Sequence, residues 1–202
     1  AYPTELSGDM VWISGLVDNG AIDGYSGATA LGIGAAEGIA GMSSAFTWEQ
    51  TFFGFVPGSI GETSTFLILL AGAYLVYTKI ASWRIIFGTL IGMIVMSSFL
   101  NFVGSETNPM FSVPWYWHLT IGGFAFGLIF MATEPVTAAS TNKGRWIYGF
   151  TIGVLVILIR VINPAFPEGM MLAILFANLL APVIDHMVVM NNIRKRKALL
   201  NE

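Results

Sequence analysis

The sequence contains no cysteine and few charged residues, and both absences narrow what the protein can be. Without a thiol, the chain can form no disulfide and can ligate neither a thiolate zinc site nor an iron–sulfur cluster. Charged residues make up 10% of the 202 residues, whereas hydrophobic residues make up 55%. The formal net charge of -3 offers no basic footprint for nucleic acid. This composition is typical of a membrane protein.

Basic residues are absent from the first third of the chain. Residues 1–62 contain neither Lys nor Arg, and all nine basic residues follow them. The acidic residues of this segment are Glu5, Asp9, Asp18, Asp23, Glu37, Glu49 and Glu62. Because cytoplasmic loops of membrane proteins are enriched in Lys and Arg, the asymmetry predicts that residues 1–62 lie on the outer side of the membrane.

The remainder of the chain consists mainly of long hydrophobic stretches. A membrane span needs about 20 apolar residues, because the hydrocarbon core is about 30 Å thick and each helical residue rises about 1.5 Å. The stretches that qualify are approximately 64–81, 84–103, 115–133, 146–162 and 169–190. Short connections between them favour antiparallel neighbours in one bundle. The sequence therefore predicts an all-α polytopic membrane protein with about five transmembrane helices.

The positions of Lys and Arg predict the orientation of these spans. The first connection is flanked by Lys79 and Arg84, and the third contains Lys143 and Arg145. The tail at 194–197 is entirely basic, whereas the second connection at 104–113 has no basic residue. The positive-inside rule places the first and third connections and the C-terminus in the cytoplasm. Arg160 disagrees with this pattern, and we interpret it as a snorkelling or ligand-facing residue.

The outer segment has features of its own. Residues 27–45 are rich in Gly and Ala, and Trp48, Phe52 and Phe55 have the spacing of one helical face. We expect a short half-helix here, at the interface or re-entrant. The stretch from Ser59 to Glu62 is typical of a capping box that opens the first span. The predicted regions are an outer segment at 1–62, a membrane bundle at 63–192 and a cytoplasmic tail at 193–202.

A heptapeptide in the outer segment presents one hydroxyl among very small neighbours. It reads Asp23-Gly24-Tyr25-Ser26-Gly27-Ala28-Thr29, with a carboxylate six residues before the Thr. The pattern resembles the flavinylation motif Asp-x-x-Ser-Gly-Ala-Thr, in which a flavin transferase esterifies the phosphate of FMN to the final Thr. The alternative is an ordinary turn, since Gly, Ser and Asp all favour turns.

Two carboxylates fall within or at the end of predicted spans. Glu134 closes the third span, and Asp185 lies in the last turns of the fifth, both with Thr or Asn nearby. Ionisable groups at membrane depth are functional candidates, and hard oxygen ligands suit an alkali cation such as sodium. The alternative is that both are interfacial residues that reach headgroup water or a basic partner. We interpret His118, beside Trp117, as an interface histidine.

Several longer blocks of sequence resemble a known family. The blocks are Ala81-Ser82-Trp83-Arg84, Pro114-Trp115-Tyr116-Trp117-His118, Phe130-Met131-Ala132-Thr133-Glu134-Pro135-Val136, Thr141-Asn142-Lys143-Gly144 and Pro167-Glu168-Gly169-Met170-Met171. They resemble the B-subunit family of the bacterial sodium-translocating NADH:quinone oxidoreductases. The related D subunit of the Rnf complex shares the flavinylation motif and the topology, but the last block is closer to the quinone-reductase family.

The resemblance implies specific roles. It makes Thr29 the attachment residue of a covalent FMN, with Asp23, Ser26, Gly27 and Ala28 completing the motif. It links Glu134 and Asp185 to sodium uptake. Electrons would pass from the flavin of the C subunit through this FMN and a riboflavin towards ubiquinone. The implied partners are the C subunit, the D and E membrane subunits and, during maturation, a flavin transferase. The implied location is the bacterial inner membrane, with the flavin-bearing segment in the periplasm.

Family members have about twice as many spans, in two similar halves. The chain begins Ala-Tyr-Pro without a starting Met. We therefore expect it to represent the second half of an inverted-repeat bundle. The favoured hypothesis is an electron-transfer component of a redox-driven sodium pump. Two alternatives remain open: a membrane component of an Rnf-type ferredoxin:NAD oxidoreductase, and a channel or facilitator of similar fold without redox chemistry.

Overall fold

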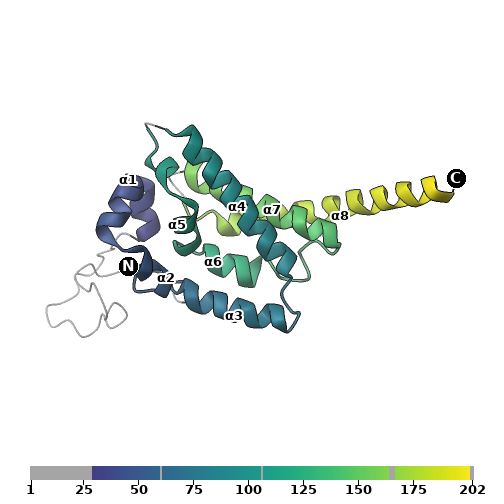
Figure 1. Ribbon diagram of the computed structural model, residues 1–202, viewed down its shortest axis with the longest axis horizontal. Helices are drawn as coiled ribbons and strands as arrows, with labels where there is room; N and C mark the ends of the chain where they lie inside the picture. Colours follow the sequence, from purple (N-terminus) through teal and green to yellow (C-terminus); the bar gives the residue numbers. More distant parts are fainter. Residues whose placement is uncertain (1–28, 60, 106, 164–166, 201–202) are drawn as a thin grey trace.

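The computed structural model describes residues 29–59, 61–105, 107–163 and 167–200 (Figure 1). Within these ranges all regular structure is helical, which confirms the predicted fold class. Thr29 is the first residue described. The other motif residues, Asp23, Ser26, Gly27 and Ala28, lie outside the described residues.

Two short helices precede the spans. α1 (Ala30–Ala45) begins at Thr29 and is kinked at Gly38, whose φ of 67° only glycine adopts without strain. α2 (Trp48–Phe53) begins with a capping box at Thr47, and Trp48 stacks on Phe52 with ring centroids 5.1 Å apart. Short helices are thus confirmed in this segment. The third member of the predicted face, Phe55, is not in α2, because the helix ends at a left-handed glycine.

The first predicted span is shorter than expected. α3 (Thr65–Tyr77) is capped by Ser64, whose Oγ accepts a hydrogen bond from the backbone N–H of Leu67 at 3.4 Å. The capping box predicted at Ser59 is therefore wrong: the Ser59 carbonyl instead accepts the N–H of Glu62 in a turn, at 3.3 Å. At about 1.5 Å per residue, α3 measures about 20 Å and does not cross a bilayer unaided.

Three helices match predicted spans and are long and apolar enough to cross a membrane: α4 (Trp83–Val103), α7 (Asn142–Ile162) and α8 (Met170–Leu200). α4 and α7 pack closely because glycines line their contact. A Cβ on Gly88, for example, would lie 2.9 Å from the carbonyl oxygen of Trp146. α8 extends away from the other helices towards the C-terminus (Figure 1).

The third predicted span is interrupted. After the 3₁₀ turn η2 (Pro109–Ser112), the chain forms α5 (Trp115–Thr120), then α6 (Phe124–Phe126) and the π-helical turn η3 (Gly127–Met131). The backbone leaves the helix at Ile121–Gly123, where Ile121 is extended and Gly122 has a φ of 62°. The prediction of a continuous helix over 115–133 is therefore wrong, because the left-handed conformation of Gly122 interrupts the helix after α5.

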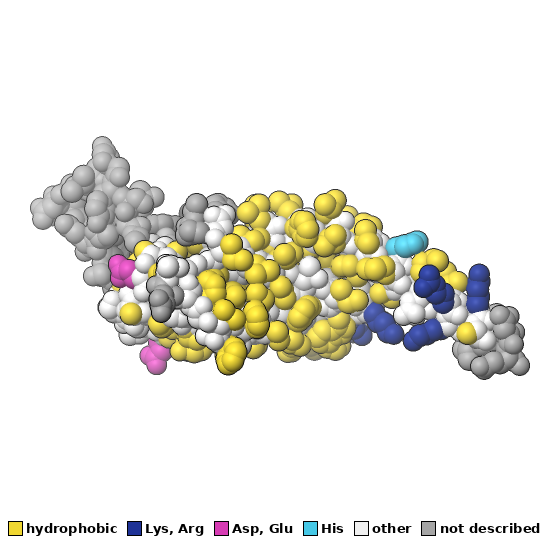
Figure 2. Space-filling view, turned by 90° about the horizontal axis from the view of Figure 1, so that it is seen from above, with side chains coloured by type: hydrophobic (Ala, Val, Ile, Leu, Met, Phe, Trp, Pro, Cys, Tyr) yellow, Lys and Arg dark blue, Asp and Glu magenta, His cyan; other side chains and the backbone are white. Residues whose placement is uncertain are grey.

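Side chains on the surface agree with a membrane setting. Figure 2 shows hydrophobic side chains over the middle of one face, acidic side chains at one end and most Lys and Arg towards the C-terminal end. Large hydrophobic residues on the spans are exposed, including Leu67 on α3, Phe99 on α4 and Leu179 on α8. Exposed apolar residues around helices of this length are typical of contact with lipid.

Candidate functional site

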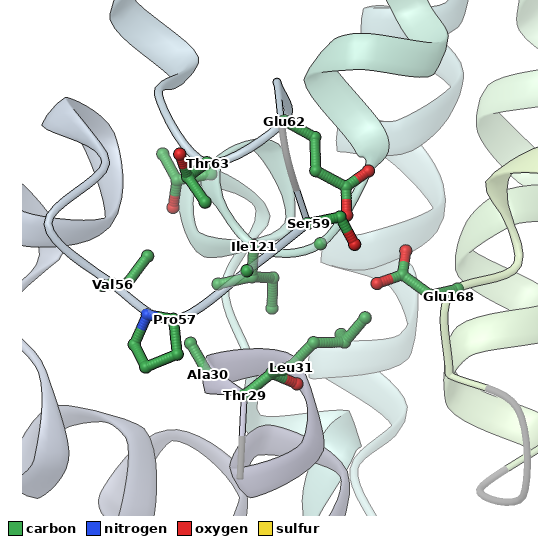
Figure 3. Close-up of a pocket in the computed structure, with 13 residues that line it drawn as sticks. Thr29, Ala30, Leu31, Val56, Pro57, Ser59, Glu62, Thr63, Ile121 and Glu168 are labelled. Atoms are coloured by element: carbon green, nitrogen blue, oxygen red, sulfur yellow. The ribbon is translucent and has the colours of Figure 1, made fainter. Parts of the chain in front are cut away.

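A small pocket opens beside Thr29 (Figure 3). Its volume is about 60 Å³, and four separate segments line it. They are the start of α1, loop residues 56–59, 62 and 63 ahead of α3, the broken third span at 120–122, and Glu168 just before α8. The pocket thus joins the predicted modification residue to the interruption in the bundle.

Thr29 holds the N-terminus of α1. Its Oγ1 accepts a hydrogen bond from the N–H of Gly32 at 3.1 Å, and its carbonyl accepts the N–H of Ile33 at 2.9 Å. The side chain is half-buried on the pocket wall. The first N–H groups of a helix carry partial positive charge and favour an anion. A phosphate esterified to Thr29 would therefore sit where the backbone stabilises its charge.

Two carboxylates meet at the break in the third span. The N–H of Gly123 donates to Oε2 of Glu168 at 3.0 Å. A Cβ on Gly122 would lie 2.7 Å from Oε1 of Glu168, and one on Gly123 would lie 2.7 Å from Oε2 of Glu62. Figure 3 shows the two carboxylates turned towards the same space. The glycine pair makes room for both carboxylates.

Arg160, on α7, is fully buried, and its guanidinium hydrogen-bonds to the backbone at this break. Its Nη1 donates to the carbonyl of His118 at 2.9 Å, its Nη2 to the carbonyl of Ile121 at 3.1 Å, and its Nε to the carbonyl of Glu168 at 3.1 Å. The first two carbonyls lie at the end of α5, where the interrupted helix no longer supplies N–H donors. Arg160 is therefore not a snorkelling residue, and it is not among the residues that line this pocket.

His118 is buried inside the protein, with 1% of its side chain exposed. Within the part of the chain that the structure describes, its Nδ1 has no hydrogen-bond partner.

The two candidate ion residues both contact the connection between η3 and α7: Glu134 is part of it, and Asp185 binds it from α8. Glu134 begins this connection and accepts hydrogen bonds from the N–H groups of Val136 and Thr137, both at 2.9 Å, and from the Thr137 hydroxyl at 2.6 Å. The hydroxyl bond, followed by the two backbone bonds, lowers the pKa of the Glu134 carboxyl.

Asp185, on α8, holds the other end of the same connection. It accepts the N–H of Ser140 at 2.7 Å, the N–H of Thr141 at 3.0 Å, and both hydroxyls of these residues. It therefore fixes the chain where α7 begins. Asp185 lies about 22 Å along α8 from Met170, at about 1.5 Å per residue. Among the described residues, no group of three or more His, Asp or Glu side chains could hold a metal ion.

Sequence reasoning missed Glu62, Glu168 and Arg160 as neighbours. The hydrogen bonds of Glu168 with Gly123 and of Arg160 with His118 join residues more than 40 positions apart. One signal in the sequence could have pointed to two of them. Charged residues are few in this chain, and Arg160 and Glu168 flank an interruption between two hydrophobic stretches.

The fold and this site define a polytopic helical membrane protein with a discontinuous span beside a candidate modification residue. The model of the NQR2, RnfD, RnfE family matches residues 1–194, and the chain belongs to that family. This confirms the resemblance inferred from the sequence blocks.

Curated relatives match almost the whole chain. It is 59% identical over 199 residues to the B subunit of the Na(+)-translocating NADH-quinone reductase of Stutzerimonas stutzeri, and 60% identical over 199 residues to that of Azotobacter vinelandii. The corresponding protein of Neisseria meningitidis serogroup A is 58% identical over 206 residues. These matches cover 98–100% of this chain but 48% of each relative. The chain thus spans about half the length of these relatives.

Proposed function

We propose that this chain carries FMN esterified to Thr29 and serves as an electron-transfer part of a sodium-translocating NADH:quinone reductase. The observation that carries the proposal is the placement of Thr29: a half-buried hydroxyl at the positive end of α1, beside the broken span. The names of the relatives support the quinone-reductase assignment over the Rnf alternative, and ubiquinone is the proposed acceptor.

The residues present fit a phosphate tether better than an enclosed flavin ring. The N-terminus of α1 suits the phosphate, but a cavity of about 60 Å³ is smaller than the roughly 300 Å³ of ordinary ligand pockets. Glu62 and Glu168 also disfavour an anion inside the cavity. We infer that the N-terminus of α1 would hold the phosphate and that this pocket would not enclose the ring. When bound, FMN supplies electron transfer, and the chain supplies attachment and orientation.

The position of Arg160 gives the broken span a defined role in this proposal. By fixing the carbonyls of His118 and Ile121, it keeps the pocket wall at Ile121–Gly122 in place next to Thr29. A tethered cofactor needs such a rigid wall to keep a constant position relative to its electron partners.

We propose that Glu134 and Asp185 act at the sodium entry. Support comes from the connection between η3 and α7, which both residues contact and which the positive-inside rule places on the cytoplasmic side. Both carboxylates order this connection through hydrogen bonds to its backbone. Their contribution would lie in shaping the entrance, since their oxygens already accept local donors.

The proposed topology has residues 1–62 in the periplasm, 63–192 in the inner membrane and 193–202 in the cytoplasm. Proposed partners are the C subunit, the D and E membrane subunits, a flavin transferase and a further riboflavin. These rest on the family and on the relatives' names.

The flavin assignment is tested on a denaturing gel of the full-length protein. We expect flavin fluorescence that stays with the polypeptide, is lost in Thr29→Ala and is retained in Thr47→Ala. Thr47 is a matched control because it also caps a helix of the outer segment through its hydroxyl. Fluorescence that survives Thr29→Ala would refute the attachment residue. An unmodified wild-type chain would favour the channel alternative.

A further inference from the structure

A second cavity, of about 550 Å³, lies at the end of the bundle opposite the start of α3. One wall is the turn from the end of α3 into α4, at 76–85. The other is the connection between η3 and α7, with lining residues from Thr133 to Arg145. Its size is in the range of sites that bind small molecules.

The cavity is positively charged. Lys79, Arg84 and Arg145 line it, and no acidic residue is among its described lining residues. Arg145 is fixed at the wall because its Nε donates to the carbonyl of Ala139 at 3.2 Å. Glu134 lies between two lining positions of the chain, but its carboxylate is bound to the backbone of its own turn. Glu134 is not a lining residue, so the three cations are the charged side chains that face the space.

The N-terminus of α4 adds to this positive potential. Ser82 occupies the N-cap position but makes no side-chain capping hydrogen bond. Its Oγ is buried and has no hydrogen-bond partner among the residues that the structure describes. By contrast, Ser64 and Thr141 do cap α3 and α7. The first N–H groups of α4, which have no side-chain cap and lie beside a cationic cavity, are suited to an anion.

The rim of the cavity is apolar. Tyr77, Ile80 and Trp83 line it and are 85%, 63% and 44% exposed. The Arg84 guanidinium lies over the Trp83 ring, 4.8 Å from its centroid. A ligand that fits both parts has an anionic head and a hydrophobic body. Aromatic residues beside basic ones are typical of the headgroup level of a membrane.

We propose that this cavity binds the headgroup of an anionic phospholipid, with the phosphate at Arg84, Arg145 and the start of α4. The acyl chains lie against the exposed apolar side of α3. Basic pockets between transmembrane helices commonly take such headgroups. The proposal requires that the chain is embedded in a membrane, and it is independent of the flavin at Thr29.

The test uses the full-length protein in its purified complex, stripped of lipid in neutral detergent. Binding of phosphatidylglycerol and of phosphatidylcholine is titrated by native mass spectrometry. We expect saturable, preferential binding of phosphatidylglycerol, weakened about tenfold by Arg84→Gln and by Arg145→Gln, because each removes a charge-assisted contact to the phosphate. Arg84→Lys should keep most of the preference. The matched control is Lys143→Gln, which removes an exposed cation at the start of α7 that does not line the cavity and should leave the lipid affinity unchanged.

Equal binding of the two lipids by the wild-type protein would overturn the proposal, and this comparison holds even if a variant fails to fold. Unchanged affinity in both Gln variants would also overturn it. Inorganic phosphate should displace bound phosphatidylglycerol only weakly. If millimolar phosphate displaces phosphatidylglycerol completely, the cavity is a site for free phosphate and the lipid assignment is refuted. Loss of flavin in Thr29→Ala leaves the lipid result unaffected, so the two proposals fail separately.

Discussion

Replacement of Arg160 tests whether the broken span depends on one buried guanidinium. The change Arg160→Met keeps an unbranched stem but removes the guanidinium, and with it the donors to the carbonyls of His118, Ile121 and Glu168. An unsatisfied buried polar group costs about 1–3 kcal/mol. Part of this cost is recovered because the buried charge is removed with its desolvation penalty. We therefore expect a net loss of about 3–5 kcal/mol.

The assay is thermal unfolding of the purified protein in detergent. For a chain of this size, 1 kcal/mol corresponds to about 2–4 °C in Tm, so Arg160→Met should lower Tm by about 10 °C. Arg145→Met is the matched control: it removes an arginine from the same helix that has one hydrogen bond to a described residue and is only half-buried. If Arg160→Met lowers Tm no more than Arg145→Met does, the guanidinium does not stabilise the break. The role assigned to it at the pocket wall is then wrong.

The remaining predictions concern the glycine at the break, the ion residues and the orientation. Gly122→Ala should lower the free energy of unfolding by about 1–3 kcal/mol, because its φ is 62° and its Cβ would lie 2.7 Å from a carboxylate oxygen. Gly61→Ala, at a φ of 86° with no atom within 4 Å of the new Cβ, should lower the free energy of unfolding by less. Equal losses in the two variants would mean that the Glu168 carboxylate moves aside freely. Asp185→Asn should raise the sodium concentration for half-maximal quinone reduction, and an unchanged value would leave Asp185 a purely structural cap. Because the chain has no cysteine, an impermeant thiol reagent added from outside should label Ser43→Cys and miss Asn192→Cys, both at exposed positions; the reverse labelling would invert the topology.

The helices of the bundle were predictable because they depend on local properties. Long apolar runs gave α4, α7 and α8 within a few residues of their observed starts. The third span was mispredicted because its residues are hydrophobic enough for a continuous helix. Only the Gly122-Gly123 pair marks the interruption, and a glycine pair in a membrane helix more often serves close packing.

The site was less predictable because its contacts join distant parts of the chain. Thr29 was identified from a linear motif, but the pocket around it combines residues from α1 to Glu168. The partner of Asp185 is the start of α7, 45 residues away, so a functional carboxylate and a helix cap look alike in the sequence. The cationic cavity was also not predictable, because its lining residues are distant in the sequence. Arg84 and Arg145 were recognised as topology signals, but no local pattern shows that they line one shared space.

Intact-mass spectrometry of the full-length wild-type protein, followed by peptide mapping, tests the central claim most directly. We predict a mass increase equal to FMN less one water, located on the peptide that contains Thr29. An unmodified mass, or a flavin on a peptide without Thr29, would contradict the assignment.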